Sequence, residues 1–503
     1  MRSLRTRAAA AILAISPAAC TVGPNFKPPE PPTAAHYTAP GEAPVREADA
    51  GTQAPKQTVA IGARVTAEWW TLFRSPDLDA LVKQAVAGNR TLESAKSKLK
   101  EAREAVTAST GALYPHVDFS ASVAREKVTA ASFGLSPASA PLPPNFNLYQ
   151  FGPSVSYALD LFGGTRREIE RQSALADVQR HQLDAAYLML TGNTVAQAVQ
   201  LAAARAQSSA IEDILAIDRQ NADLVGKKRE AGTAPDSDVV TAESQIAADE
   251  TLRPGPEQQL SVAKHALAVL LGRAPGDWTP PDFGLDSLVL PGRLPVSLPS
   301  ELVHQRPDIL AAEAQLHAAS ARIGVATAAL YPNITLSASI GTAALAPKHL
   351  FDPSSLMWSI AAGLTEPIFD GGMREADRRA ALAAFKAAAA DYQETVLQAF
   401  GQVADILQAL AHDAQLLAAQ QHALDMASQS VRLQGISYAG GGTGILDLLD
   451  AQRQYQQARL GYVRAEAQRY QDTIQLLIAM GGGWWDAKLE SDLDAARSFS
   501  GTS

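Results

Sequence analysis

The chain has 503 residues, of which 47% are hydrophobic and 19% charged, with Lys+Arg 43 against Asp+Glu 52 and a formal net charge of −9. An acidic chain lacks the clustered basic side chains that nucleic-acid binding needs, so nucleic acid is excluded as the main partner. The single cysteine excludes an internal disulfide framework and a cysteine-based zinc site. Beyond the leader the sequence has no run of about 18 apolar residues, so no transmembrane helix is predicted.

Residues 1–19 are predicted to be a signal peptide that is removed in front of Cys20. Three arginines precede the apolar run 8–15, and small residues lead up to the cysteine. This pattern favours lipoprotein processing, in which Cys20 becomes the lipidated N-terminus and anchors the chain to a membrane. Pro17 stands where the lipoprotein recognition site usually has Leu, so ordinary cleavage that leaves a free cysteine is the alternative.

The remainder of the chain repeats itself once. Leu113-Tyr114-Pro115 recurs as Leu330-Tyr331-Pro332, and Gly232-Thr233 recurs as Gly442-Thr443. A repeat of this length is too long for a solenoid and indicates a duplicated half. The predicted segments are a lipidated N-terminal strap without a core over 20–68, a first repeat over 69–273, a Pro-rich linker over 274–300, a second repeat over 301–480 and a C-terminal tail over 481–503.

Each repeat is predicted to carry two amphipathic strands, in which large apolar residues alternate with small or polar ones. The strands are expected at about 114–128 and 147–162 in the first repeat, and at about 331–342 and 355–369 in the second. One apolar face and one small, polar face are typical of strands with lipid on one side and water on the other. A half-buried sheet of a soluble protein is the alternative.

Four such strands cannot close a barrel by themselves, and in lipid every sheet edge must be paired. Two chains would supply eight strands, whose side chains nearly fill the interior of a barrel. Three chains would supply twelve, the smallest shared number that leaves a useful lumen. The strands therefore predict a homotrimeric pore, with extracellular loops over 125–147 and 342–355.

Very long helices are expected after the strands, over about 163–225 and 371–434, because few helix breakers lie inside them. At 1.5 Å per residue each would be roughly 95 Å long, which predicts a rod-like or tubular coiled-coil layer. Shorter helical patterns are expected at 78–111, at 307–329 and from about 236, the last ending at Pro254-Gly255-Pro256.

Short motifs spread over the chain carry a resemblance to a known family. They are Cys20-Thr21-Val22-Gly23-Pro24, Trp69-Trp70, Leu298-Pro299-Ser300-Glu301-Leu302, Arg306-Pro307-Asp308-Ile309, Leu330-Tyr331-Pro332 and Gly481-Gly482-Gly483-Trp484. With these motifs in order, the chain resembles the TolC-like outer-membrane efflux channel family, in its lipoprotein (OprM/NodT-like) branch. The resemblance implies an α+β membrane protein, a homotrimer whose twelve-stranded β-barrel, with four strands per chain, continues into a long periplasmic α-helical barrel.

The same resemblance implies a tripartite efflux system in the Gram-negative outer membrane. The partners would be a periplasmic adaptor protein, an inner-membrane pump of the resistance-nodulation-division type and outer-membrane lipid. The chain would be a passive exit duct for drugs or other small toxic compounds, with a gated periplasmic aperture. The alternatives are the outer-membrane duct of a type I secretion or metal-export system, and a non-conducting periplasmic coiled-coil scaffold.

The turns between the long helices and the returning helices carry the candidate gate. Asp447 and Asp450 are i,i+3 neighbours on one helix face, and in a trimer they would form two stacked rings that favour cations. The alternative is that acids near a helix start only interact with the helix dipole. The resemblance implies that both line the aperture, and that Tyr438 and Asp238 tie neighbouring hairpins together. The basic residue of that network falls on Thr443 in this chain.

Three basic residues at the first turn, Lys227-Lys228-Arg229, are the candidates that could replace the missing partner, and a solvated turn is the alternative. Residues at both turns are expected to contact the partner protein: Gly226, Lys227, Gly232, Thr233, Gly435, Gly441, Gly442 and Thr443. The glycines 440–442 and Gly444 are interpreted as turn residues, since no Lys-Ser/Thr follows as in a phosphate loop.

No catalytic, cofactor or metal site is predicted. The sequence has no H-E-x-x-H motif, no G-x-S-x-G motif and no P-loop, and its nine histidines are scattered without ligand spacing. Trp69-Trp70 and Trp484-Trp485 are interpreted as packing anchors for the strap and the tail.

Overall fold

The computed structural model describes residues 21–34, 36–38, 57–127, 145–282 and 284–484. The predicted signal peptide, the lipidation site Cys20 and nearly all of the tail lie outside the described residues. Two compact units are present, and we name them for their content. The strand unit comprises Leu99–Val178 and Ala312–Asp391 with the N-terminal segment up to Pro29, and the helix unit comprises Glu30–Lys98, Gln179–Ala311 and Tyr392–Ser503.

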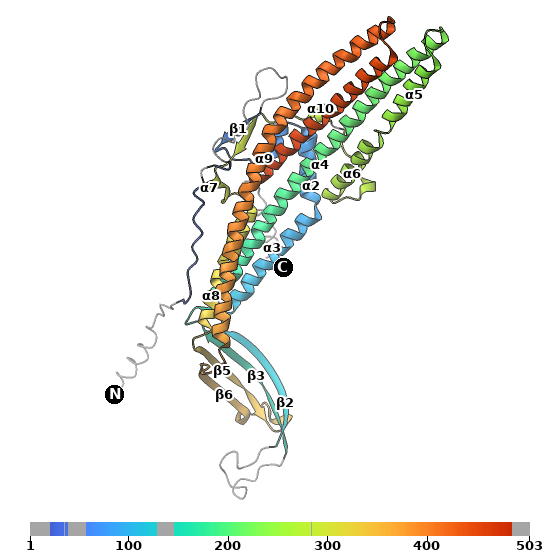
Figure 1. Cartoon of the computed structure of the whole chain (residues 1–503). Coiled ribbons are helices and arrows are strands. Elements are labelled where there is room, and N and C mark those ends of the chain that lie inside the picture. Colours follow the sequence, from blue (N-terminus) through green and yellow to red (C-terminus); the bar gives the residue numbers. More distant parts are fainter. Residues whose placement is uncertain (1–20, 35, 39–56, 128–144, 283, 485–503) are drawn as a thin grey trace. The chain divides into compact units, whose positions relative to one another are not determined.

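The strand unit contains one antiparallel sheet of four strands (Figure 1). Its order is β2-β3-β5-β6, with β2 His116–Glu126, β3 Phe146–Leu159, β5 Asn333–Ala344 and β6 Leu356–Thr365. All four strands predicted from the alternation are confirmed. Each hairpin pairs with the other through β3 and β5, so β2 and β6 form the edges, and neither bonds a further strand among the described residues.

Large apolar side chains of the edge strands point away from any core. Phe119 of β2 is 69% exposed, and Trp358 and Ile360 of β6 are 70% and 79% exposed. On the other face small and polar side chains meet, as where the hydroxyls of Ser339 and Ser359 lie 2.8 Å apart. A half-buried soluble sheet would cover its apolar face, so the alternation instead matches a sheet whose apolar face needs a non-aqueous neighbour.

The connections between strands differ in how much is described. The segment between β2 and β3 lies largely outside the described residues. The segment between β5 and β6 is shorter than the loop predicted over 342–355, because β5 continues to Ala344 and two short 3-10 turns follow, Pro347–His349 and Pro353–Ser355.

The N-terminal strap is fixed to the strand unit by one buried arginine. Arg167 donates from its guanidinium to the carbonyl oxygens of Val22 (3.1 Å) and Gly23 (3.2 Å) and to Oδ1 of Asn25 (2.8 Å). Gly23 has φ +91°, and a Cβ on it would lie 2.5 Å from Cα of Gly324. The strap therefore requires glycine at this crossing.

Two helices of 67 residues dominate the chain, α4 Gly164–Glu230 and α9 Met373–Ala439. Both extend a few residues past the predicted C-terminal ends. The other long elements are α3 Arg90–Gly111, α8 Pro307–Ala328, α5 Asp236–Glu250, α6 Pro254–Leu270 and α10 Ile445–Ala479. The order α3-β2-β3-α4-α5 thus recurs as α8-β5-β6-α9-α10, and the returning helix of the first half breaks in front of Pro254, as predicted. No helix within the described residues has a stretch apolar enough to span a membrane.

The helical pattern expected over 78–111 is two helices, because Asn89 ends one and begins the next. Helix α2 covers Pro76–Gly88. The backbone N–H of Asn89 closes α2 on the carbonyl of Ala85 (2.9 Å), while its Oδ1 accepts from the N–H of Leu92 (2.9 Å) as the N-cap of α3. Glycine and asparagine both favour helix ends, so the pair Gly88-Asn89 separates the two helices.

The structure contains a short parallel strand pair that the sequence patterns do not predict. Within the predicted strap, β1 Thr58–Ile61 pairs with β4 Arg293–Val296 of the predicted linker. The adjoining Gln57 is buried, and it donates to the carbonyl of Pro291 (3.1 Å) and accepts from Nε of Arg469 (2.9 Å). The strap therefore does enter a core, which depends on a pairing over more than 230 residues that no local pattern reveals.

The core of the helix unit includes the tryptophans that were predicted as anchors. Trp69 and Trp70 are 0% and 2% exposed, and Trp70 Nε1 donates to Oδ1 of Asp79 (3.0 Å). Trp484 Nε1 donates to the carbonyl of Gln305 (2.7 Å). Trp485 lies outside the described residues.

Candidate gate at the helix tips

The turns that join α4 to α5 and α9 to α10 have the same backbone geometry. Gly232 and Gly441 adopt φ +72° and +78°, the left-handed conformation that ends many helices. The backbone hydrogen bonds also correspond: N–H of Thr233 to O of Lys228 (2.8 Å), Gly232 to Arg229 (2.9 Å), Gly442 to Ser437 (2.8 Å) and Gly441 to Tyr438 (3.1 Å). The equivalent of Gly232 is therefore Gly441, one residue before the match that the sequence repeat suggests.

An apolar cluster joins the two turns within one chain, and we call it the tip cluster. It lies in the helix unit at the end where α4, α5, α9 and α10 meet (Figure 1). Its buried members are Val225, Ala242, Tyr438, Ile445, Leu448 and Leu449. Tyr438 contributes the largest side chain, at 4% exposure. The candidate gate residue Tyr438 is thus part of the packing that closes the two hairpins on each other.

Lys228 is the basic side chain that reaches from the first hairpin to the second. Its ammonium donates a hydrogen bond to the backbone carbonyl of Tyr438 and lies 3.8 Å from the centre of the Tyr438 ring. A cation at this place interacts with the ring face and with the negative end of α9. Of the three basic candidates for the missing partner at Thr443, the described structure brings Lys228 to Tyr438.

The other two basic side chains pair within the first hairpin. Lys227 forms an exposed ion pair with Asp223 one turn earlier, and Arg229 lies 3.7 Å from Asp236 across the turn. Both pairs are solvated, as expected for the alternative interpretation of this turn.

Two hydroxyl groups at the second tip have no hydrogen-bond partner among the described residues. They are the buried Oη of Tyr438 and Oγ1 of Thr443. Burial, and then the negative charge of Asp238, raise the pKa of Tyr438. No hydrogen bond joins Asp238 to Tyr438 among the described residues, so the link between these two residues stays a prediction.

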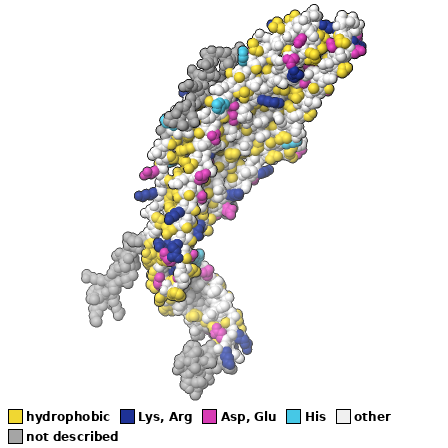
Figure 2. Space-filling view, in the orientation of Figure 1, with side chains coloured by type: hydrophobic (Ala, Val, Ile, Leu, Met, Phe, Trp, Pro, Cys, Tyr) yellow, Lys and Arg dark blue, Asp and Glu magenta, His cyan; other side chains and the backbone are white. Residues whose placement is uncertain are grey.

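Asp447 and Asp450 lie at the start of α10 and have partners of their own. Oδ2 of Asp447 accepts from the N–H of Gly444 (3.3 Å), which caps the helix. Asp450 forms an ion pair with Arg453 and accepts from Nε2 of Gln454 (2.8 Å). Within one chain both acids therefore interact with their own helix. Figure 2 shows acidic and basic side chains together at this end of the helices.

Two helical glycines near the tips leave open space beside the backbone. Gly226 of α4 and Gly435 of α9 each stand four residues before the end of their helix, and a Cβ on either would meet nothing within 4 Å. Large apolar side chains nearby are exposed to solvent in the single chain, namely Val240 (60%), Ile436 (63%) and Leu446 (69%). The tips therefore present surface that the described residues do not cover.

A cleft of about 460 Å³ runs between α5 and α10 below the turns. Its lining residues are Thr241, Ser244, Gln245, Leu446, Leu449, Asp450 and Arg453. Leu446 and Asp450 thus face a groove that is open to another molecule.

Two pairs of aspartates, of which Asp218, Asp249 and Asp413 are buried and Asp472 is half-buried, are not anticipated by the sequence patterns. Asp218 of α4 faces Asp249 of α5, and Asp413 of α9 faces Asp472 of α10. Burial, reinforced by the neighbouring carboxyl, raises the pKa of Asp218 and that of Asp413 to about 7 each. The ionised forms of Asp218 and Asp413 are therefore disfavoured by their surroundings.

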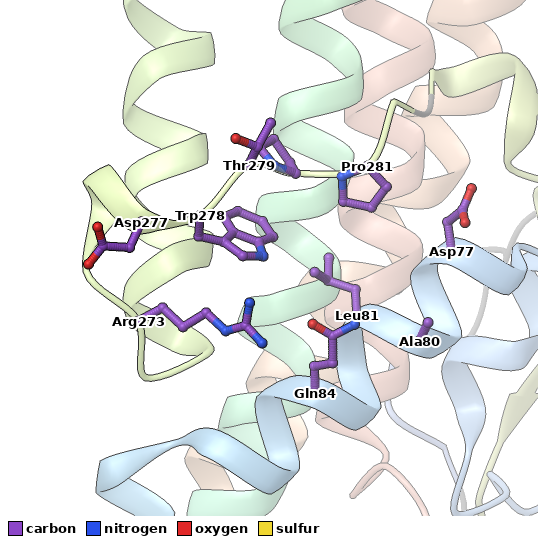
Figure 3. A pocket seen from close by; sticks show the side chains of 10 residues that line it. Asp77, Ala80, Leu81, Gln84, Arg273, Asp277, Trp278, Thr279 and Pro281 are labelled. Atoms are coloured by element: carbon purple, nitrogen blue, oxygen red, sulfur yellow. The ribbon is translucent and has the colours of Figure 1, made fainter.

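A second cleft, of about 470 Å³, is lined by residues of α2 and of the segment 273–281, none of which belongs to the tips (Figure 3). It separates α2 from the segment that follows α6. The Trp278 ring and the Leu81 side chain point into it, with Arg273 towards one end and Asp77 at the other. Trp278 is only 7% exposed, so its ring belongs to the packing of the wall and offers no free stacking surface.

Comparison with known proteins identifies relatives of this chain. The family model described as "Outer membrane efflux protein" matches residues 81–273 and 298–482. The pyoverdine export outer membrane protein OpmQ of Pseudomonas aeruginosa is 31% identical over 448 residues, which cover 87% of this chain and 92% of that protein. Nodulation protein T of Rhizobium leguminosarum bv. viciae is 28% identical over 497 residues, which cover 97% of this chain and 96% of that protein.

Solved structures agree with the sequence comparisons. The outer-membrane channel OprN superposes with a TM-score of 0.82 at 29% identity, and the match covers 92% of this chain and 100% of that chain.

Proposed function

The chain belongs to the outer membrane efflux protein family, and from that premise we propose that three copies of it form the passive exit duct of a tripartite pump. The chain is an outer-membrane efflux channel component. Trimer assembly, the gate and the partners are the proposed part. The duct catalyses nothing itself, and the inner-membrane pump supplies the energy.

The observation that carries the proposal is the sheet with two unpaired edges and an outward apolar face. Among the residues that the structure describes, the outer edges of β2 and β6 pair with no further strand, so their outward backbone groups lack a strand partner. In hydrocarbon each such group costs several kcal/mol, so the edges pair with other chains. Three sheets give twelve strands around a lumen of useful width.

The helix tips supply the periplasmic aperture. In each subunit Lys228 holds the second hairpin by Tyr438, and it takes the place of the basic partner that is lost at Thr443. Opening requires α9 and α10 to move away from α4 and α5, which breaks this contact and separates the tip cluster. In the trimer, Asp447 and Asp450 form acidic rings around the axis that favour cations.

The adaptor protein is proposed to dock on the open sides of the tips. A glycine inside a helix costs about 1 kcal/mol relative to alanine, and neither Gly226 nor Gly435 is required by contacts of this chain. Both are explained if a partner helix approaches the backbone closely there. The other predicted partner contacts are Lys227, Gly232, Thr233, Gly441, Gly442 and Thr443, all at the two turns.

The cargo is proposed to be drugs or other small toxic compounds. The relative OpmQ is named for pyoverdine export, and a passive duct leaves the choice of cargo to its partners. An inner-membrane pump of the resistance-nodulation-division type would make that selection.

Assembly in a membrane tests the proposal against a non-conducting scaffold. The purified mature protein should migrate as a trimer before boiling and as a monomer afterwards, and should give single-channel conductance in a planar bilayer. Ile360→Arg puts a charge on the lipid face and should cost about 2–4 kcal/mol, which lowers the yield of trimer.

The matched control is Ala361→Arg, one residue along the same strand on the lumen face. It should leave the trimer intact and change the conductance. A protein that stays a water-soluble monomer without detergent, or that tolerates Ile360→Arg and Ala361→Arg equally, would contradict the shared barrel.

A further inference from the structure

A buried polar cluster interrupts the apolar packing of α4, α5 and α10. Asp218 of α4, Asp249 of α5 and Gln456 of α10 are 4%, 5% and 8% exposed. Along α4 and α10 these residues lie between the tip cluster and a second apolar cluster. That second cluster consists of Ala210, Ile211, Ile214, Leu215 and Leu460, with Ile246 and Leu252 packed against it.

The acid on α4 occupies a position of the buried helix face. Asp218 follows Ile211, Ile214 and Leu215 at the spacings seven, four and three, which is the spacing of one helix stripe. A carboxyl at such a position is removed from water when the helices pack. This stripe was the signal in the sequence that could have revealed the cluster.

The contacts of the two carboxyls require a proton. Asp249 accepts from Nε2 of Gln245 in its own helix (2.9 Å) and from Nε2 of Gln456 in α10. Oδ2 of Asp218 has no donor among the described residues, and its carboxyl lies within hydrogen-bonding reach of Asp249. Ionised carboxylates only accept, so the two can bond each other only when one of them is protonated.

We propose that Asp218 and Asp249 share one proton, and that this proton fastens the end of α5 to α4 and, through Gln456, to α10. Loss of the proton leaves two like charges in dry packing, which drives the carboxyls apart. Asp249 lies in the last turn of α5, directly before the break at residues 251–253. The joint between α5 and α6 is therefore the part that opens.

This joint goes beyond the exit-duct function, since it links the two hairpins of one subunit to pH. The negative end of α5 adds to the repulsion that Asp249 experiences when both acids are charged. Other charged groups on or beside the packed helices form ion pairs: Arg219 with Glu250 (3.6 Å), Arg253 with Glu212 (3.0 Å) and Arg453 with Asp450. Of these, Arg219 opposes the effect of Asp249 on Asp218.

The direction of the pH dependence follows from the raised pKa of Asp218, about 7 in the folded chain. An exposed aspartate titrates near 4, so opening of the joint releases a proton between about pH 4 and pH 7. The joint is most stable below that range and loses stability as the pH rises through 7. Above 7 no further change is expected.

Hydrogen exchange on the purified mature trimer in detergent tests the proposal. The opening equilibrium of residues 245–256, corrected for the intrinsic exchange rate, should rise by up to tenfold per pH unit from pH 5 to 7 and then level off. In Asp218→Asn the amide donates to Asp249 at every pH. That variant should show no rise, and its joint should be better protected than wild type at pH 8.

Asp413→Asn is the matched control, because that pair joins α9 to α10 and does not touch α5. It should leave the slope at residues 245–256 unchanged. A flat wild-type profile would overturn the proposal, even if Asp218→Asn did not assemble, and so would a slope that persists in that variant. Neither result depends on conductance, so failure of the joint is distinct from failure of the duct.

Discussion

The two helix tips of this chain share a backbone and differ in their side chains. Gly232 and Gly441 make the same left-handed turn with the same pair of hydrogen bonds. The first tip carries Lys227-Lys228-Arg229, whereas the second carries Tyr438 and the acids of α10. One glycine conformation therefore gives the same turn with different charges around it.

The difference has a direct consequence for closure. Lys228 of the first tip contacts Tyr438 of the second, so the two tips are complementary halves of one contact. A pair of identical tips would place like charges together and could not form it. The two tips share their backbone geometry, and their different side chains provide the attraction between them.

Truncation of Tyr438 should have the largest effect on this complementarity. Tyr438→Ala empties the centre of the tip cluster and should destabilise the closed tips by about 3 kcal/mol, seen as faster hydrogen exchange at residues 436–449. Tyr438→Phe removes only a hydroxyl that has no hydrogen-bond partner in the described part of the chain. It should leave exchange within about 0.5 kcal/mol of wild type, and a loss above 1 kcal/mol would mean that another subunit bonds this hydroxyl.

Removal of the basic partner should have an intermediate effect. Lys228→Met takes away both the cation over the ring and the donor at the end of α9, and should cost about 1–2 kcal/mol of tip stability. Closed-state conductance in a planar bilayer should rise with it, while Lys228→Arg should keep most of the contact.

Lys227→Met is the control for the loss of one positive charge at the same turn. Its side chain is exposed and pairs with Asp223 in its own helix, so neither exchange nor conductance should change measurably. Equal effects of the two methionine variants would show that net charge matters rather than the contact with Tyr438.

The acids of the second tip should affect stability least and ion preference most. Asp447→Ala removes a cap and should cost about 0.5–1 kcal/mol. Asp447→Ala together with Asp450→Ala should lower cation preference, measured as a reversal potential in a salt gradient. Asp236→Ala, the acid that begins the corresponding helix of the first tip, should not lower it, and an equal shift would contradict the assignment of the aperture to the second tip.

Local patterns account for most of the secondary structure. Alternation located β2, β3, β5 and β6 within a few residues, because a strand with one apolar face has period two whatever it packs against. The absence of breakers located both 67-residue helices, and Pro254 located the break after α5. The dipeptide Gly88-Asn89 indicates a helix boundary from the sequence. That Asn89 caps both helices is known only from its hydrogen bonds to Ala85 and Leu92 in the structure.

Contacts between distant segments could not be predicted in the same way. The pairing of β1 with β4 brings the strap into a core. Each of these strands has only four residues, which is too short for a recognisable alternation of polar and apolar side chains. At the tips, three adjacent basic residues were equivalent candidates, and their positions around α4 separated them: Lys228 faces α9, while its neighbours face solvent or their own hairpin.

Sequence alone was sufficient for the amphipathic strands, the long helices, the glycine turns and the family to which the chain belongs, since each is set by residue types at short spacing. Tertiary packing was needed for the order β2-β3-β5-β6, for the contact of Lys228 with Tyr438 and for the meeting of Asp218 with Asp249. The physical reason is that burial and a shared proton depend on which helices lie together, and periodicity along one helix does not identify its neighbour.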